Sequence, residues 1–190
     1  MKQQVSKELH DYWRSLKGAR LAPERNDIEF GAIRRLLANV FILQIDCSGR
    51  FPLKMCGTRI NALWLDEQKE RSFQELWDER NRAAIASTLS AVTDEARPVV
   101  IGARNGAGDR PRLDLEILLL PLRHFGRTHS LVLGSFALAN EPDWLGRMPV
   151  GPLQIQSLRV LGSGETSLKL PARRPRLVLH EGGKAGDLFA

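Results

Sequence analysis

The sequence has few cysteines and no long apolar run. Only two cysteines, Cys47 and Cys56, occur in 190 residues, and neither belongs to a Cys-x-x-Cys motif. We interpret both as reduced residues in or near the core, not as redox or metal ligands. No apolar run approaches the roughly 18 residues of a membrane span, and Met1 leads into a polar segment without a secretory signal. These absences predict a cytoplasmic protein with no membrane partner.

The charge is basic but scattered. Lys and Arg number 28 against 22 Asp and Glu, which gives a net charge of +6 and a pI of about 9.8. Such a balance favours acidic partners. The only tight clusters are Arg34-Arg35 and Arg173–Arg176, and neither is a long basic stripe with interleaved aromatic residues. The pattern therefore disfavours nucleic acid as a partner.

Five apolar segments have the composition of strands. Residues 98–104, 113–120 and 130–138 are separated by turn-forming residues at 105–109 and 123–127, which predicts a three-stranded antiparallel meander. Residues 40–47 and 51–56 predict a hairpin before it. Several of these segments are apolar on both faces, so both faces of the sheet need covers.

Helical spacing of apolar residues appears between and before these strands. One stripe near the N-terminus consists of Leu9, Tyr12, Trp13 and Leu16. It packs on the domain itself or forms a dimer interface. Further helices are expected at 26–37, 57–64, 72–77 and 79–96, with a Ser72–Glu75 capping box and Asp78 as the cap of the longest helix. The order predicts an α+β fold with a five-stranded antiparallel sheet covered on one face by helices, plus an N-terminal amphipathic helix and a C-terminal extension.

The order of these elements resembles that of PAS domains. The residues that carry the resemblance are Asn61-Ala62, Ser72–Trp77 and Asp78–Arg82, which runs into Ala83–Ile85. The chain is also similar to a group of small PAS proteins best known from alphaproteobacteria. The matching motifs are Leu9–Trp13, Ala32–Leu37, Cys56–Arg59, Leu118–Leu122 and Trp144–Gly146. In one departure, Leu65–Lys69 stands where this group has a glycine-containing turn.

The resemblance implies a sensory or dimerising signalling module with a pocket between the sheet and the helices from Gly57 to Ala96. Its expected lining consists of Met55, Arg59, Trp64, Trp77, Ile85 and Leu119, whose apolar members can equally fill a closed core. Arg59 is the residue suited to an anionic ligand, because a guanidinium binds such groups bidentately. The sequence names no cofactor for this pocket.

The chemistry of known PAS cofactors has no match in this sequence. No histidine lies between Glu79 and Ala96 to serve as a haem ligand, and neither cysteine has the context of a flavin photoreceptor. His124 and His129 flank a turn, and we read them as exposed side chains, not a metal pair. Asp114 and Glu116 stand beside Arg112 and are expected to form cross-strand ion pairs. The prediction is therefore no enzyme, no catalytic residue and no metal.

The expected organisation has four parts: an N-terminal helical cap at 1–38, a PAS core at 39–140, an extension at 141–162 and a basic flexible tail at 163–190. The leading hypothesis is a non-catalytic sensory or adaptor module of bacterial signalling, which binds an unidentified signalling protein and is a homodimer through Leu9, Tyr12, Trp13 and Leu16. One alternative is a receptor for an anionic metabolite or nucleotide. Another is a nucleic-acid-associated regulator that uses the basic tail.

Overall fold

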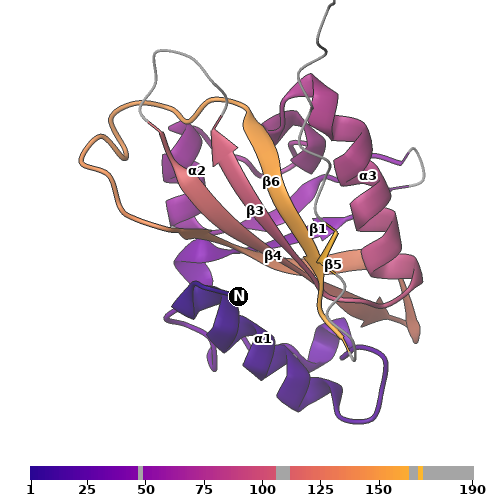
Figure 1. Cartoon of the computed structure of the whole chain (residues 1–190). Helices are drawn as coiled ribbons and strands as arrows, with labels where there is room; N and C mark the ends of the chain where they lie inside the picture. Colours follow the sequence, from indigo (N-terminus) through magenta and orange to yellow (C-terminus); the bar gives the residue numbers. More distant parts are fainter. Residues whose placement is uncertain (47–48, 106–111, 163–166, 169–190) are drawn as a thin grey trace, which may run out of the picture.

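A single antiparallel sheet runs through the whole molecule (Figure 1). The computed structural model describes residues 1–46, 49–105, 112–162 and 167–168, without the side chains of His129, Ser167 and Leu168. Its strands stand in the order β2-β1-β5-β4-β3-β6-β7, and all neighbours are antiparallel. Their bounds are β1 Val40–Gln44, β2 Leu53–Cys56, β3 Val99–Asn105, β4 Asp114–His124, β5 Arg127–Leu138, β6 Leu153–Val160 and β7 Ser167–Leu168.

The first five strands of this order are the ones that the sequence predicts, and the α+β antiparallel fold is confirmed. The C-terminal extension lengthens the sheet beyond the predicted five strands. β6 pairs with β3 from Val99↔Val160 to Asn105↔Leu153, so β3 is an interior strand. Covering the edge of β3 in this way removes a row of unpaired backbone groups.

The helices α2 (Thr58–Trp64) and α3 (Glu79–Asp94) and the 3-10 turn η3 (Phe73–Leu76) cover one face of the sheet. Strand residues such as Phe41, Ile101 and Ile117 meet them there in one buried cluster. Asp78 caps α3 as predicted, because its Oδ1 accepts a hydrogen bond from the Arg80 amide at 2.9 Å. The predicted capping box at Ser72 does not form, since the Ser72 side chain makes no cap hydrogen bond.

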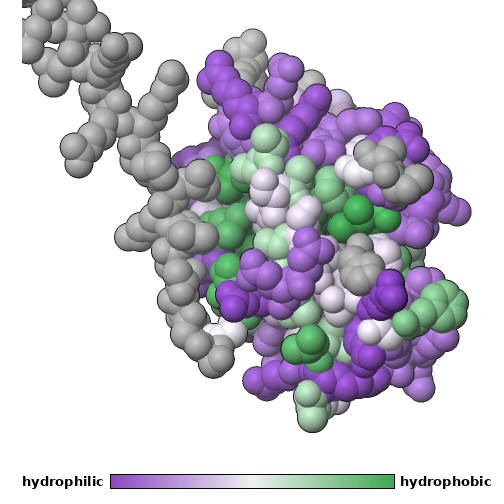
Figure 2. All heavy atoms as spheres, turned by 90° about the vertical axis from the view of Figure 1, so that its right-hand side faces the viewer, coloured by the Kyte–Doolittle hydropathy of each residue, from purple (hydrophilic) through white to green (hydrophobic). Residues whose placement is uncertain are grey.

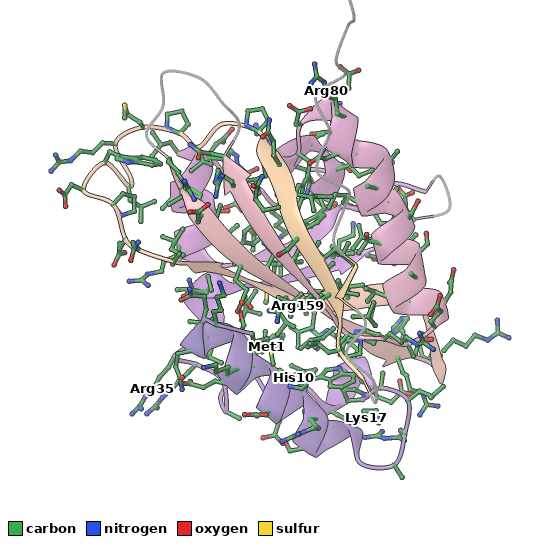
Figure 3. All side chains as sticks on the ribbon, in the orientation of Figure 1. Met1, His10, Lys17, Arg35, Arg80 and Arg159 are labelled. Carbon is green, nitrogen blue, oxygen red and sulfur yellow. The ribbon has the colours of Figure 1, made fainter. Side chains whose placement is uncertain are left out.

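The opposite face is covered by α1 (Gln4–Lys17) and the segment after it (Figure 1). Leu9 and Trp13 pack there against alternate strand residues such as Ile42, Leu118 and Leu120. Met1 and Lys17 mark the two ends of the helix beneath the sheet (Figure 3). The strands are thus buried on both faces, which explains their nearly continuous apolar sequences.

The helix predicted over residues 26–37 does not form. The chain makes a 3-10 turn η1 at Arg25–Asp27, further turns, and a second 3-10 turn η2 at Leu37–Asn39. Gly31 near the middle disfavours a continuous helix, and Asp27 acts as the last residue of a capping box with Glu24 instead of opening a helix. The described residues contain no helix long and apolar enough to cross a membrane.

Candidate functional site: a filled inner core and three surface features

The space between the sheet and the helices α2 and α3 is filled by aromatic side chains. Phe73 lies at its centre, with ring centroids 5.4 Å from Phe41, 6.1 Å from Phe136 and 6.0 Å from Trp77. Trp64 meets Phe136 edge-on at 5.8 Å. Contacts of this kind are typical of a packed aromatic core. The region where the sequence predicts a ligand pocket is therefore occupied by the protein's own rings.

Four of the six predicted pocket residues belong to this core. Trp77, Ile85 and Leu119 are fully buried, and Trp64 is partly buried against the same cluster. The indole Nε1 of Trp77 is one of four buried side-chain polar atoms that lack a hydrogen-bond partner in the described part of the chain. A buried N–H that lacks an acceptor costs free energy, so this atom marks the place where a bound acceptor would be favourable.

The structure places Met55 and Arg59 away from the other four. The register of β1 and β2 shifts between Ile42 and Leu43, so Met55 pairs with Ile42 and packs on the α1 side of the sheet. A bulge of this kind turns the residues beyond it to the opposite face. Arg59 is 56% exposed and lies 3.4 Å from Glu141 at the surface. Neither side chain reaches the aromatic core.

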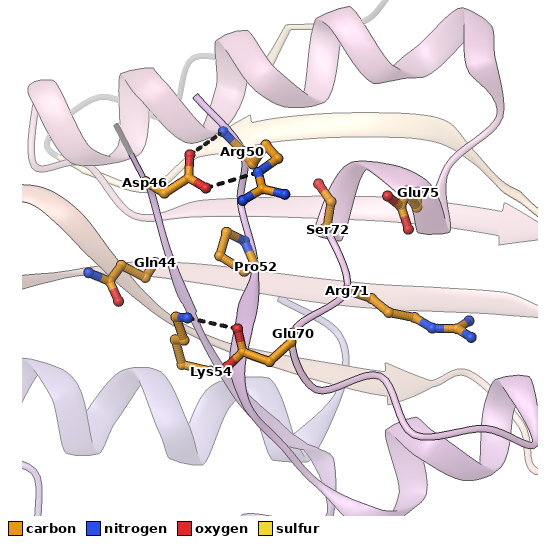
Figure 4. Close-up of a pocket in the computed structure, with 9 residues that line it drawn as sticks. All are labelled: Gln44, Asp46, Arg50, Pro52, Lys54, Glu70, Arg71, Ser72 and Glu75. Atoms are coloured by element: carbon orange, nitrogen blue, oxygen red, sulfur yellow. Dashed lines mark hydrogen bonds and ion pairs between the residues drawn. The ribbon is translucent and has the colours of Figure 1, made fainter. Parts of the chain in front are cut away.

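A polar cleft of about 410 Å³ lies at the β2 edge of the sheet (Figure 4). Asp46 and Arg50 form an ion pair on one side of it, and Lys54 and Glu70 form a second at 2.8 Å. With Glu75 and Arg71, the cleft is lined by three acidic and three basic side chains. Because opposite charges already meet within the cleft, it has no excess charge with which to attract an ion.

A larger groove of about 1260 Å³ lies between the second half of α1, the second half of α3 and the end of β6. Its base includes the buried side chains of Trp13 and Val99, while Arg14 and Arg97 are exposed at its edge. Burial lowers the pKa of His10, which also lines the groove, so this side chain is neutral near pH 7. Arg14 is paired with Asp11 and Arg97 with Glu95, but Lys17 also lines the groove, so three cations stand there against one acidic residue. The groove therefore combines an apolar base with basic edges. Sequence reasoning missed it, because its three walls lie far apart along the chain.

The predicted dimer residues of α1 are divided between the inside and the surface. Leu9 and Trp13 are buried against the protein's own sheet, and Trp13 Nε1 donates a 2.8 Å hydrogen bond to the Pro121 carbonyl. Tyr12 and Leu16 are half-buried at the edge of the same cluster. Only the latter two side chains are partly available to a partner.

Glu116 anchors the other end of α1. Its carboxylate accepts hydrogen bonds from the amides of Lys2 at 2.7 Å and Gln3 at 3.0 Å. The expected cross-strand ion pair of Glu116 is therefore wrong, since the side chain faces the start of α1, where free amides and the helix dipole attract a carboxylate. Asp114 does pair with Arg112, and also with Arg104 at 2.7 Å.

Comparison with known proteins identifies the family. A family model described as a PAS domain matches residues 1–137, which is most of the chain. The chain belongs to the PAS domain family. The family predicted from the sequence is therefore confirmed. The antiparallel sheet with flanking helices is consistent with it.

The solved structures similar to this PAS protein are distant. The LOV protein of Rhodobacter sphaeroides is 11% identical with a TM-score of 0.44, over 61% of this chain and 71% of that chain. An RNA-binding Light-Oxygen-Voltage receptor is 20% identical with a TM-score of 0.41, over 62% of this chain and 33% of that chain. Similarities this weak add nothing on function. Among curated proteins no match is found.

The part of the PAS domain that the structure describes holds no cluster of side chains suited to a metal ion. No group of three or more His, Cys, Asp or Glu side chains converges there. His124 is exposed at the β4–β5 turn, and the side chain of His129 lies outside the description. The turn predicted at 105–109, apart from Asn105, also lies outside it, as does the tail predicted at 163–190, apart from residues 167–168.

The segment Leu65–Lys69, where the sequence departs from the glycine-containing turn of similar PAS proteins, begins with a left-handed residue. Leu65 ends α2 in the left-handed conformation with φ of 54° and donates its amide to the Asn61 carbonyl. Glycine adopts this conformation without strain, whereas leucine does so at a cost.

Proposed function

We propose that this PAS domain is a non-catalytic adaptor of signalling, which acts by binding another protein and not by sensing a ligand in its core. PAS membership supports the signalling class. The filled aromatic core is the observation that favours protein binding over ligand sensing. Five aromatic rings occupy the space that a core ligand would need. The groove between α1, α3 and β6, with its apolar base and basic edges, suits an amphipathic acidic segment of the partner.

A second candidate is a small-ligand receptor, and one atom favours it. The buried Nε1 of Trp77 lacks an acceptor in the described residues, and a small ligand with an acceptor oxygen would satisfy it. Arg59 no longer supports this function, because it is exposed and faces Glu141. The third alternative, nucleic-acid binding by the basic tail, stays a prediction, since residues 169–190 lie outside the description.

The two candidates differ in whether a ligand stabilises the fold. We would unfold the full-length purified chain in guanidinium chloride, remove released small molecules by dialysis, and refold it. The adaptor predicts the same thermal midpoint before and after, with no small molecule in the dialysate by mass spectrometry. A ligand held at well above its Kd would contribute several kcal/mol, so its removal would lower the midpoint by several degrees. A lower midpoint together with a released compound would rule out the adaptor function and support the receptor function.

A further inference from the structure

The β4–β5 turn contains a residue type that its backbone geometry disfavours. His124 pairs with Arg127, so Phe125 and Gly126 form a two-residue hairpin turn with φ of 51° and 79°. Two positive φ values in succession require the type of turn that favours Asn-Gly. A bulky aromatic residue at the first position is strained, and strained residues gather at functional sites.

Phe125 contributes nothing to the hydrophobic core that would offset this strain. Its side chain is 89% exposed, and the one ring that it contacts among the described residues is that of His124, at a centroid distance of 4.3 Å. An exposed Phe also works against solubility. Neither folding nor solubility therefore accounts for this residue, which leaves binding as the role that fits.

A second exposed apolar side chain lies at the same end of the molecule. Leu21, 70% exposed, follows α1, and its loop is tied to the hairpin because the Arg123 amide donates to the Pro23 carbonyl at 2.8 Å. Arg123 also lies 3.3 Å from Glu24. Among the described residues these are the two most exposed large apolar side chains. Figure 2 shows one side of the molecule, on which isolated hydrophobic side chains lie among hydrophilic ones.

The surroundings of this pair are basic. The loop from Lys17 to Asp27 and the turn from Arg123 to Arg127 contain five Lys and Arg against two acidic residues. Both acids are already paired, Asp27 with Arg20 at 2.7 Å and Glu24 with Arg123. The other three cations, Lys17, Arg25 and Arg127, have no carboxylate partner in the described structure. Lys17 is visible at this end in Figure 3.

We propose that Leu21 and Phe125, with the cations around them, form a peripheral docking tip for an anionic lipid bilayer. A convex apolar projection needs a counter-surface into which it can sink, and the headgroup region of a bilayer provides one. The basic surroundings complement the diffuse negative charge of anionic lipids, which attract cations near the bilayer surface. The sequence predicts no membrane partner because it lacks a span, but interfacial binding needs no span.

The test is sedimentation of the full-length chain with vesicles that contain about equal parts phosphatidylglycerol and phosphatidylcholine. Phe125→Asn removes the apolar anchor and gives the turn a favoured residue, so this variant is expected to be at least as stable as the wild type. Its partition onto the vesicles is expected to fall about tenfold, the cost of losing one buried aromatic side chain. Arg127→Ala is expected to lower it about fivefold.

A matched control is available in Leu65→Asn. Leu65 is also exposed and has a left-handed backbone, with φ of 54°, but it lies at the end of α2, away from the tip. The control is expected to bind the vesicles like the wild type, and all variants retain the basic tail. The proposal is overturned if the wild type does not bind anionic vesicles, or if Phe125→Asn binds them as well as Leu65→Asn. Binding only to an isolated acidic protein would assign the tip to a protein partner instead. The tip does not depend on the state of the aromatic core, so either proposal can fail alone.

Discussion

At the residue scale, Gly57 occupies a position that admits no side chain. A Cβ at this position would meet the backbone carbonyls of Leu37 and Ala38, which cannot move as a flexible side chain can. Its φ of −70° suits any residue, so the constraint is one of space alone. Gly57→Ala is expected to lower the free energy of unfolding by about 2 kcal/mol or more in urea denaturation. Gly31→Ala, with nothing within 4 Å, is the control and should change it by less than about 0.5 kcal/mol.

Cys56 gives a second residue-scale prediction. Burial, with a smaller effect of Glu67, raises the pKa of the Cys56 thiol from 9.0 to about 12. The thiol is therefore protonated and slow to react with a disulfide reagent at pH 8 to 9 in the folded chain, and fast once urea unfolds it. Because the folded pKa is the higher one, this contribution to stability is present below pH 9 and is lost as the pH rises towards 12.

The reaction is followed in the Cys47→Ser chain, so that Cys56 is the only thiol. Equal rates for the folded and unfolded chain at pH 8 would show that Cys56 is exposed and would contradict its place beside the inner core.

At the scale of elements, α1 is held at both ends by β4. Glu116 binds the first amides near its N-terminus, and the Pro121 carbonyl accepts from Trp13 towards its other end. Glu116→Ala is expected to cost about 1–3 kcal/mol in urea unfolding, as for the loss of a helix cap and of buried hydrogen bonds. Amide exchange should accelerate across Gln4–Lys17 and remain unchanged in α3. Glu116→Gln keeps an acceptor oxygen, so its exchange rate across Gln4–Lys17 should lie between those of the wild type and Glu116→Ala. Equal exchange rates in all three chains would show that Glu116 does not anchor α1.

Local patterns predict most of these elements, but not where each side chain points. Apolar alternation and helical spacing place the strands and α3 within a few residues of their observed bounds. The bulge that turns Met55 to the α1 side has no signal in the sequence, because both Leu53 and Met55 are apolar. Glu116 likewise looks like any strand carboxylate, and only the docking of a helix 113 residues before it reveals its partner. The groove and the Phe125 tip depend on such long-range contacts too.

At the scale of the whole molecule, dimerisation through α1 stays a prediction. Leu9 and Trp13 are committed to the protein's own sheet, so a dimer would use Tyr12 and Leu16. Leu16→Asp is therefore expected to lower the mass measured by light scattering from dimer to monomer without unfolding the chain. An unchanged dimer mass for Leu16→Asp would rule out α1 as the interface. Trp13→Ala is a poor probe, because removing a buried Trp costs about 3–5 kcal/mol of stability.

Aromatic side chains fill the core where a PAS ligand would lie. The most direct test is the native mass of the full-length chain, freshly purified, compared with its mass after denaturation. If the core is filled, the native mass per subunit equals that of the polypeptide, and nothing is released on denaturation. A small molecule bound in a one-to-one ratio and released on unfolding would contradict it, and would point to the unpaired Nε1 of Trp77 as its contact.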